Sequence, residues 1–400
     1  MGHVIPTKAG SWRANWREPG GKQRSKTFTT KREATAYLTQ TEATINQGAY
    51  VSPQGGRAKF GDLALRWLAS RNDEPTTIAR DASIMKTHVI AKWGGWRVGT
   101  IGHMDHQEWI THLGRSLAPA TVAECHRLTA AVCQSAVRAK LIGSNPCDGA
   151  RLPKRRKRDT DDHIITREQL LTQLLPAVPD RYRALVATAG GTGTRWGEAA
   201  GLCTDALDLD RRVLRVVRTV IEVSGHISFK PYPKSGAGRR EIPLPAWLPP
   251  ILREHTDRYP TGHNGLIFTN TAGGPVSRTS FRARIWRPSL VRAGLLGQIT
   301  TPASDVVEAH WTDKQGLPQA ARFGNHDHAV AHLARHATGA PTFHTLRHSY
   351  ATWLVDDGVP VNMVQKVLGH EKSSTTLDLY TRKTSNHDRI REALDGPHAE

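Results

Sequence analysis

Six side chains along this 400-residue sequence have the types needed to cleave a phosphodiester without a metal ion. Two arginines can bind the non-bridging oxygens, a tyrosine can attack phosphorus, and a lysine and a histidine can move protons. We therefore expect no cofactor. The six residues are Arg195, Lys234, His344, Arg347, His370 and Tyr380.

The order of these residues is more specific than any single one. The pattern H-x-x-R occurs four times, so one match alone indicates little. The match at His344 and Arg347 is the one followed most closely by L-G-H (368–370). Tyr380, in S-T-T-L-D-L-Y, lies ten residues after His370. The joint occurrence predicts an active site.

The charges of these groups fit an anionic ligand. His344 and Arg347 are three residues apart and would share a helix face, where they repel unless an anion such as phosphate lies between them. Arg195 starts a predicted helix, and Glu198 is expected to form a salt bridge with it and to orient its guanidinium.

Lys234 could be an ordinary exposed turn residue and Tyr380 an ordinary tyrosine, but the other motifs favour a catalytic role for both. Lys234 precedes a glycine-rich turn, where a lysine can reach a leaving oxygen or simply be exposed. A free tyrosine has a pKa of about 10 and is a poor nucleophile. Neighbouring cations would stabilise the Tyr380 phenolate and make attack feasible.

Composition points to a polyanionic partner. Lys and Arg number 55 against 36 Asp and Glu, which gives a formal net charge of +19. Nucleic acid is the first candidate, although some proteins are basic without binding it. Four cysteines without C-x-x-C pairs, no signal-peptide core and no 18-residue apolar run predict a cytoplasmic protein without a membrane span.

The N-terminal segment 1–55 is predicted to be a two- or three-stranded sheet backed by one helix. Strands over 12–17 and 25–30 flank a turn, and a helix is expected over 31–45. Its eight Lys and Arg favour DNA contact over a merely solvated sheet. The residues expected to touch DNA there are Arg13, Arg17, Lys22, Arg24 and Lys26.

A helical segment (57–152) and a linker (153–163) follow. Helical patterns run over 60–68, 76–90 and 118–143. The linker is basic and then acidic, without periodicity. Its Lys154, Arg155 and Arg156 either lie along DNA phosphates or belong to a solvated hinge.

The remaining segment, 164–400, mixes helices and strands. A helix is expected over 181–190, a turn into a second helix over 192–202, and helices again from Ser277 onward; strands are expected over 213–223, 226–230 and 239–245. Residues 295–341 resemble a surface insertion rich in histidine with little core. Three histidines in it, His328, His332 and His336, share a spacing of four, but no cysteine or carboxylate completes a zinc site, so we expect no metal.

Several segments together resemble tyrosine recombinases of the phage and plasmid integrase type. They are T-G-T-R-W-G-E-A-A-G-L, P-K-S-G-A-G-R-R-E-I-P-L, H-T-L-R-H-S-Y-A-T-W-L, V-L-G-H and S-T-T-L-D-L-Y-T. The resemblance implies a mainly α fold with small β-sheets. It also implies an arm-type DNA-binding domain at 1–55, a helical core-site-binding domain at 57–152 and a catalytic domain at 164–400. The insertion at 295–341 departs from the family pattern.

The resemblance also implies roles. Tyr380 would form a 3′-phosphotyrosyl bond, Arg195 and Arg347 would stabilise the transition state, and Lys234 would protonate the 5′ oxygen. His344 would assist proton transfer and His370 would hydrogen-bond the phosphate.

The implied partners are double-stranded DNA at attachment sites and three further copies of the chain, as a homotetramer on DNA. A host DNA-bending protein and an excisionase are the implied helpers. The implied activity is integration of a phage or mobile element, with excision left open. A type IB topoisomerase and a DNA-binding repressor of the same fold are the rival interpretations.

Overall fold

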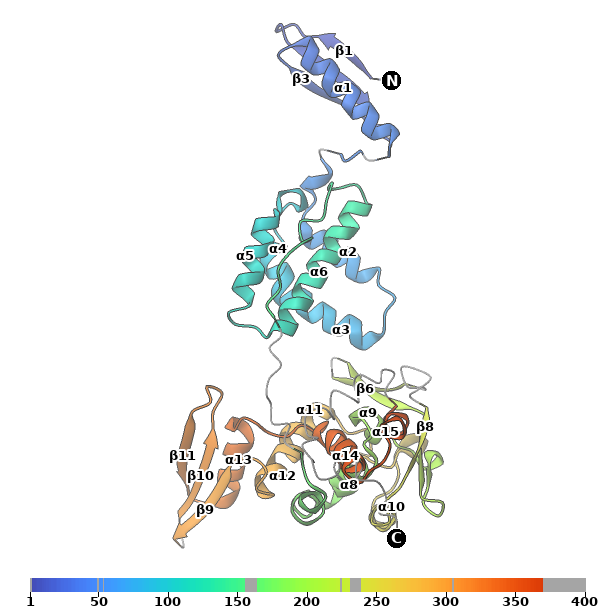
Figure 1. Ribbon diagram of the computed structural model, residues 1–400, viewed down its shortest axis with the longest axis vertical. Helices are drawn as coiled ribbons and strands as arrows, with labels where there is room; N and C mark the ends of the chain where they lie inside the picture. The colour runs from blue at the N-terminus through green and yellow to red at the C-terminus, as the bar shows by residue number, and fades with distance from the viewer. Residues whose placement is uncertain are drawn as a thin grey trace, which may run out of the picture. The chain divides into compact units, whose positions relative to one another are not determined.

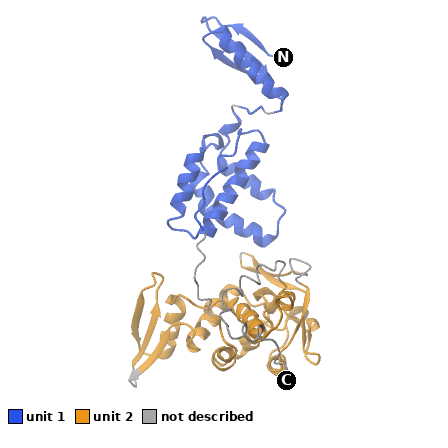
Figure 2. Ribbon diagram, viewed as in Figure 1, with its two compact units in different colours: residues 1–158 blue, residues 159–400 orange. Residues whose placement is uncertain are grey.

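The computed structural model describes residues 2–48, 50–52, 54–154, 164–223, 225–230, 239–303 and 306–369. The chain divides into two compact units, Met1–Arg158 and Asp159–Glu400 (Figure 2). Helices make up most of the regular structure and the sheets are small, as expected. Among the described residues, no helix is both long enough and apolar enough to cross a membrane.

The first unit begins with an antiparallel sheet in the order β1-β2-β3, covered by helix α1 (Figure 1). Its elements are β1 (His3–Pro6), β2 (Trp12–Arg17), β3 (Gln23–Phe28) and α1 (Lys31–Asn46). Thr30 caps the start of α1: its side chain accepts the backbone N–H of Glu33, and the Glu33 side chain accepts the backbone N–H of Thr30. Ala14 and Trp16 of β2 pack against Leu38 of α1 and form a small core.

A second, separate core in the same unit lies among helices. These are α2 (Phe60–Ala69), α3 (Pro75–Ile84), α4 (Ala91–Trp93), α5 (His103–Leu113) and α6 (Pro119–Arg138), with a π-helical segment (Met85–Ile90) between α3 and α4. Phe60, Trp93 and Leu128 are fully buried in it. The predicted helix over 118–143 ends earlier, at Arg138, because the chain turns through a left-handed residue at Lys140.

The second unit has nine α-helices among the described residues, and most of them pack around one main core. They are α7 (Leu175–Ala177), α8 (Asp180–Thr192), α9 (Trp196–Ala200), α10 (Leu248–Arg258), α11 (Arg278–Phe281), α12 (Arg287–Arg292), α13 (His326–His336), α14 (Thr345–Asp356) and α15 (Val361–Leu368). Leu185, Trp286 and Leu346 lie in that core. Helix α14 contacts both α8 and α15, so segments distant in sequence meet there.

Two small sheets lie between α9 and α10. One has the order β4-β5-β8, with β4 (Leu207–Asp208), β5 (Val213–Val216) and β8 (Arg240–Pro243), and the other pairs β6 (Thr219–Val223) with β7 (His226–Lys230). The single strand predicted over 213–223 is therefore wrong. The chain leaves the first sheet at Val217 and Arg218, where the Arg218 guanidinium donates two hydrogen bonds to Asp205, at 2.7 and 2.6 Å.

The expectation of little core in 295–341 is also wrong. This segment forms an antiparallel sheet of β9 (Gln298–Ala303), β10 (Val306–Thr312) and β11 (Pro318–Phe323), with α13 beside it (Figure 1). Strand β10 alternates, so Val307 and Ala309 point into the core of the unit, where Leu333 of α13 joins them. The prediction that helices dominate from Ser277 onward is therefore wrong for this segment. Its apolar residues are interspersed with histidines, and the sequence prediction overlooked them.

One histidine of α13, His332, packs as an aromatic side chain. The ring of His332 lies 4.8 Å from that of Trp311 and 5.1 Å from that of Phe323, measured between centroids. Within the described ranges, no three His, Cys, Asp or Glu side chains are grouped so that they could hold a metal ion.

Because Leu333 is fully buried, Leu333→Ala should destabilise the second unit by about 2–5 kcal/mol. Leu317→Ala, in the exposed turn between β10 and β11, should change stability by less than about 0.5 kcal/mol. Hydrogen exchange followed by mass spectrometry would report the opening free energy of α13 and its neighbours in each variant. Equal effects would contradict a core role for this segment.

Candidate active site

Arg195 and Glu198 meet at the junction of α8 and α9. Helix α8 ends at Gly193, whose left-handed backbone (φ 61°) and contact with Tyr350 leave no room for a side chain. Glu198 Oε2 accepts the backbone N–H of Arg195 at 2.9 Å, and Oε1 accepts Arg195 Nη1 at 2.8 Å. The salt bridge expected from their spacing is present.

Arg347 joins α14 to the ends of two other helices. Arg347 is 2% exposed. Its guanidinium donates to the carbonyl of Gly193 at 2.9 Å and to that of Leu368 at 2.7 Å. Both acceptors lie at helix C-terminal ends, where carbonyls lack intrahelical partners and carry partial negative charge. The fold therefore holds Arg347 through the backbone.

Three guanidinium groups bind three successive carbonyls at the end of α15. We call these carbonyls, of Val367, Leu368 and Gly369, the carbonyl end of α15. Arg240 donates to the first at 2.5 Å, Arg347 to the second, and Arg195 to the third at 3.3 Å. Gly369 is left-handed (φ 66°), and this conformation ends the helix.

Arg240 is a site residue that the sequence predictions missed. On β8 it lies opposite Val216 of β5 and two residues before the buried Ile242, so it occupies a position that normally holds an apolar side chain. Its guanidinium binds both oxygens of Glu198, at 3.2 and 2.8 Å. An arginine at an inward strand position in R-R-E-I-P-L was the available signal.

The electrostatics of the site favour an anion. Burial opposes ionisation of Glu198, but the hydrogen bonds and charge of Arg240 and the charge of Arg195 outweigh it and lower its pKa to about 2. Burial, and then repulsion by Arg195, lowers the pKa of Arg347 to about 9, which still leaves it protonated at pH 7. Three guanidinium groups thus lie near a single carboxylate, and two of them bond to it. A bound anion would relieve the excess positive charge.

His344 lies at the N-terminal end of α14, and its ring meets that of His348 at 4.8 Å between centroids. Desolvation, and then repulsion by His348, Arg347, Arg195 and Arg278, lowers its pKa to about 4. The residue is exposed, so its imidazole is accessible to a ligand. At pH 7 the imidazole is neutral and able to accept a proton.

The structure brings together four of the predicted site residues: Arg195, Glu198, His344 and Arg347. Lys234, His370 and Tyr380 lie outside the described residues. In sequence, Lys234 falls between β7 and β8, and His370 directly follows Gly369.

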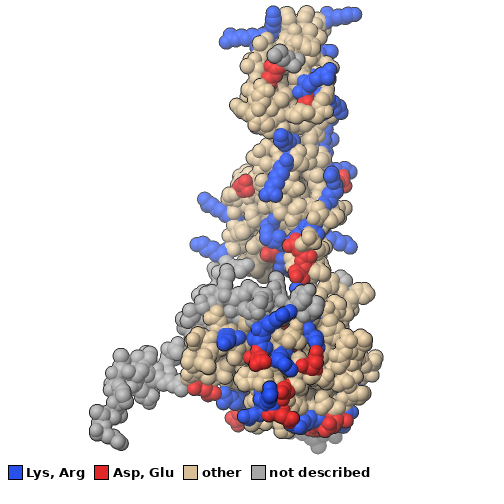
Figure 3. Space-filling model, turned by 90° about the vertical axis from the view of Figure 1, so that its right-hand side faces the viewer, with Lys and Arg blue, Asp and Glu red and all other residues tan. Residues whose placement is uncertain are grey.

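The residues predicted to contact DNA have different environments. Arg13, Arg17, Lys22 and Lys154 are exposed, whereas Arg155 and Arg156 lie outside the described residues. Arg24 pairs with Glu18 at 2.9 Å, and the ammonium of Lys26 lies over the ring of Tyr37, 4.6 Å from its centroid. On the face in Figure 3, Lys and Arg side chains project from the first unit with few acidic ones between them.

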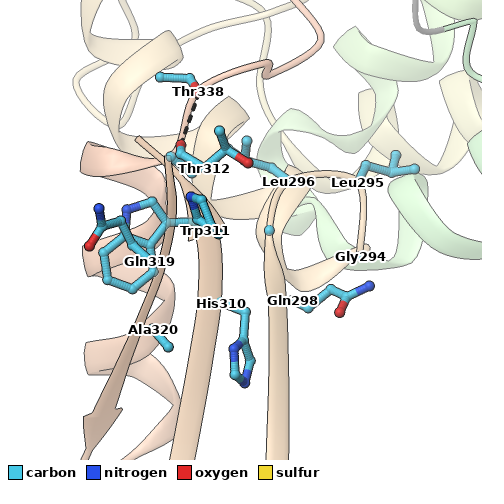
Figure 4. A pocket seen from close by; sticks show the side chains of 13 residues that line it. Gly294, Leu295, Leu296, Gln298, His310, Trp311, Thr312, Gln319, Ala320 and Thr338 are labelled. Carbon is cyan, nitrogen blue, oxygen red and sulfur yellow. Dashed lines mark hydrogen bonds between the residues drawn. The ribbon is translucent and has the colours of Figure 1, made fainter. Parts of the chain in front are cut away.

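A pocket of about 700 Å³ lies at one end of the β9–β11 sheet (Figure 4). Its wall includes His310, Trp311 and Gln319, and Thr338 donates a hydrogen bond to the carbonyl of Thr312 at 2.9 Å. Of the predicted site residues that the structure describes, none lines it. A second pocket, of about 820 Å³, is lined by Arg240, Met363 and Gly369 among others, and therefore adjoins the carbonyl end of α15.

Comparison with known proteins identifies the class. The sequence profile of the phage integrase family matches residues 321–387. The putative prophage phiRv2 integrase of Mycobacterium tuberculosis is 30% identical over 282 residues, which cover 67% of this chain and 72% of that protein. The chain belongs to the phage integrase family of tyrosine recombinases and is a site-specific recombinase.

Solved structures share the fold. The Tn1549 transposon integrase in complex with transposon right end DNA is 17% identical, with a TM-score of 0.60 over 84% of this chain and 99% of that one. A lambda integrase tetramer bound to a Holliday junction is 16% identical, with a TM-score of 0.54 over 94% of each chain.

The Glu198 pKa yields a prediction about stability. Since its folded-state value lies below the usual 4.5, the ionised carboxylate stabilises the fold above about pH 4.5. That contribution, on the order of 3 kcal/mol, is lost as pH falls toward 2. Glu198→Gln should therefore be less stable than the unsubstituted chain at pH 7, and the difference should narrow below pH 4.5.

Urea unfolding across this pH range would measure the difference, with Glu254→Gln on the exposed face of α10 as the control. A gap between Glu198→Gln and the unsubstituted chain that stays constant with pH would show that Glu198 is not held ionised.

Proposed function

We propose that this recombinase cleaves and rejoins DNA through a 3′-phosphotyrosyl intermediate at Tyr380, and that it integrates a phage or mobile element. The observation that best supports this is the cluster of the partly exposed Arg195 with the buried Arg347 and Arg240 around the single carboxylate of Glu198. Such a cluster is suited to the negative charge that a phosphoryl transition state spreads over its oxygens.

In the proposed reaction the Tyr380 oxygen attacks phosphorus and the bond to the 5′ oxygen breaks. Lys234 protonates that leaving oxygen, and the neutral His344 accepts the proton that the Tyr380 hydroxyl loses. Arg195 and Arg347 stabilise the charge on the non-bridging oxygens, and His370 hydrogen-bonds the phosphate. The 5′-hydroxyl of a partner strand then attacks the phosphotyrosyl bond, releases Tyr380 and restores a phosphodiester without ATP.

The substrate we propose is double-stranded DNA at attachment sites, bound by residues 1–55 as an arm-type domain and 57–152 as a core-site domain. The solved complexes of related integrases with DNA support this proposal. Four copies would exchange strands, as the lambda integrase tetramer on a Holliday junction suggests. Host bending proteins and an excisionase are the proposed accessory partners.

A covalent trap tests the nucleophile. The full chain is mixed with labelled, nicked duplex DNA from beside its own gene, in EDTA and without ATP, and denatured in SDS. The unsubstituted chain should form an SDS-resistant adduct, and Tyr380→Phe should form none because it lacks the attacking oxygen. Persistence of the adduct in Tyr380→Phe would identify a different nucleophile.

The exposed sheet arginines give a separate prediction about DNA binding. Arg13 lies on β2 and is exposed, whereas its neighbours Trp12 and Ala14 belong to the core under α1. Arg13→Ala should weaken binding to duplex DNA and reduce the slope of log affinity against log salt by about 0.9, the loss of one phosphate contact.

Arg32→Ala, which removes the same charge from α1, is the matched control. Gel-shift titrations at several salt concentrations would measure both slopes. An equal change in the two variants would mean that the sheet face is not the DNA-contacting face.

A further inference from the structure

Each nitrogen of the Arg240 guanidinium donates a hydrogen bond within the protein. Its side chain is 4% exposed. Nη1 and Nη2 donate to the two oxygens of Glu198, and Nε donates to the carbonyl of Val367. A planar fork of this kind fixes the orientation of its partners as well as their distance.

These bonds link both partners of Arg195. Glu198 receives Arg240 on one side and the backbone and side chain of Arg195 on the other, so each carboxylate oxygen accepts two hydrogen bonds. Val367 directly precedes Leu368 and Gly369, whose carbonyls hold Arg347 and Arg195. Arg240 therefore joins Glu198 to the carbonyl end of α15, as Arg195 also does, but Arg240 does so from a buried position, with a side chain that is 4% exposed against 42% for Arg195.

We propose that Arg240 is a positioning residue for strand cleavage, which locks Glu198 and the carbonyl end of α15 together so that Arg195 and Arg347 are held where the phosphate binds. This inference rests on the proposed function of the site. Because its side chain is only 4% exposed and each of its nitrogens donates to a protein acceptor, Arg240 acts through the other two arginines and does not bind the phosphate itself.

Sequence adds a second reason for the location. His370 follows Gly369 directly, and Tyr380 is ten residues further on. The carbonyl end of α15 therefore directly precedes His370 in the sequence and lies eleven residues before Tyr380. Arg240 holds the carbonyl end of α15 against Glu198 and so fixes the point from which the chain continues to His370 and Tyr380. Loss of Arg240 would therefore disturb both the two catalytic arginines and the approach of the nucleophile.

The test compares Arg240→Met, Arg240→Lys and Arg215→Met in the full chain. Arg215 lies on the neighbouring strand β5, with an exposed side chain that donates to the carbonyl of Asp205, and serves as the matched control. Adduct formation on the nicked duplex at saturating protein gives the cleavage rate. Gel shifts give the DNA affinity, and thermal unfolding checks the fold.

Arg240→Met should lower the cleavage rate by about 100-fold, the effect of displacing catalytic groups by roughly 1 Å, while affinity changes by less than about threefold. Arg240→Lys keeps the charge but loses the fork, so its rate should fall by about 10-fold with thermal stability close to that of the unsubstituted chain. Arg215→Met should cleave normally.

A pH profile separates positioning from a general loss of structure. The charged groups that face Glu198 are Arg195 beside it, Arg240 from β8 and Arg347 from α14. Without Arg240, burial of Glu198 is opposed by fewer cations and favours its protonated form more, so the cleavage rate of Arg240→Met should fall at a higher pH than that of the unsubstituted chain. Adding Glu198→Gln to Arg240→Met should abolish that fall.

The proposal would be overturned by normal cleavage in Arg240→Met, or by parallel losses of affinity, rate and thermal stability with no change in pH profile. Full recovery in Arg240→Lys would also overturn it, since charge alone would then suffice. If the unsubstituted chain forms no adduct, the proposed function fails, and the Arg240 inference fails with it. If the unsubstituted chain cleaves and Arg240→Met does too, only the inference fails.

Discussion

The binding of arginine side chains to backbone carbonyls at helix ends is the interaction on which the catalytic unit depends. Arg347 holds the end of α8 at Gly193 and the end of α15 at Leu368, and Arg195 holds Gly369. Helix C-terminal carbonyls need donors, and clustered guanidinium groups need negative partners. The same contacts satisfy both needs, so the helices are joined by the groups that prepare the site for an anion.

Glu198 limits how much positive charge remains. A single buried carboxylate receives two arginines and leaves the cluster with excess positive charge, because Arg347 bonds only to carbonyls in the described contacts. Full neutralisation would remove the attraction for phosphate, and removal of Glu198 would leave buried like charges uncompensated. The site therefore balances stability of the free protein against affinity for an anion.

Local patterns in the sequence predicted much of this arrangement, because Arg195, Glu198, His344 and Arg347 lie on helices whose periodicity and spacing are local. Arg240 was missed since its partners, Glu198 and Val367, are 42 and 127 residues away, and only the tertiary fold brings them together. The core of 295–341 was missed for a different reason. Its histidines occupy one face of α13, and the apolar stripe of Val330 and Leu333 lies beside them.

The distances along the chain between these partners also have a consequence for biosynthesis. Arg347 and Gly193 are 154 residues apart, and Arg195 and Gly369 are 174 apart. Contacts of such long sequence separation form late, after local helices and hairpins. On the ribosome, Gly369 emerges after nearly all of the second unit. A nascent chain therefore has Arg195 and Arg240 without their carbonyl partners until the end of α15 has been synthesised, and it acquires an ordered site only after that point.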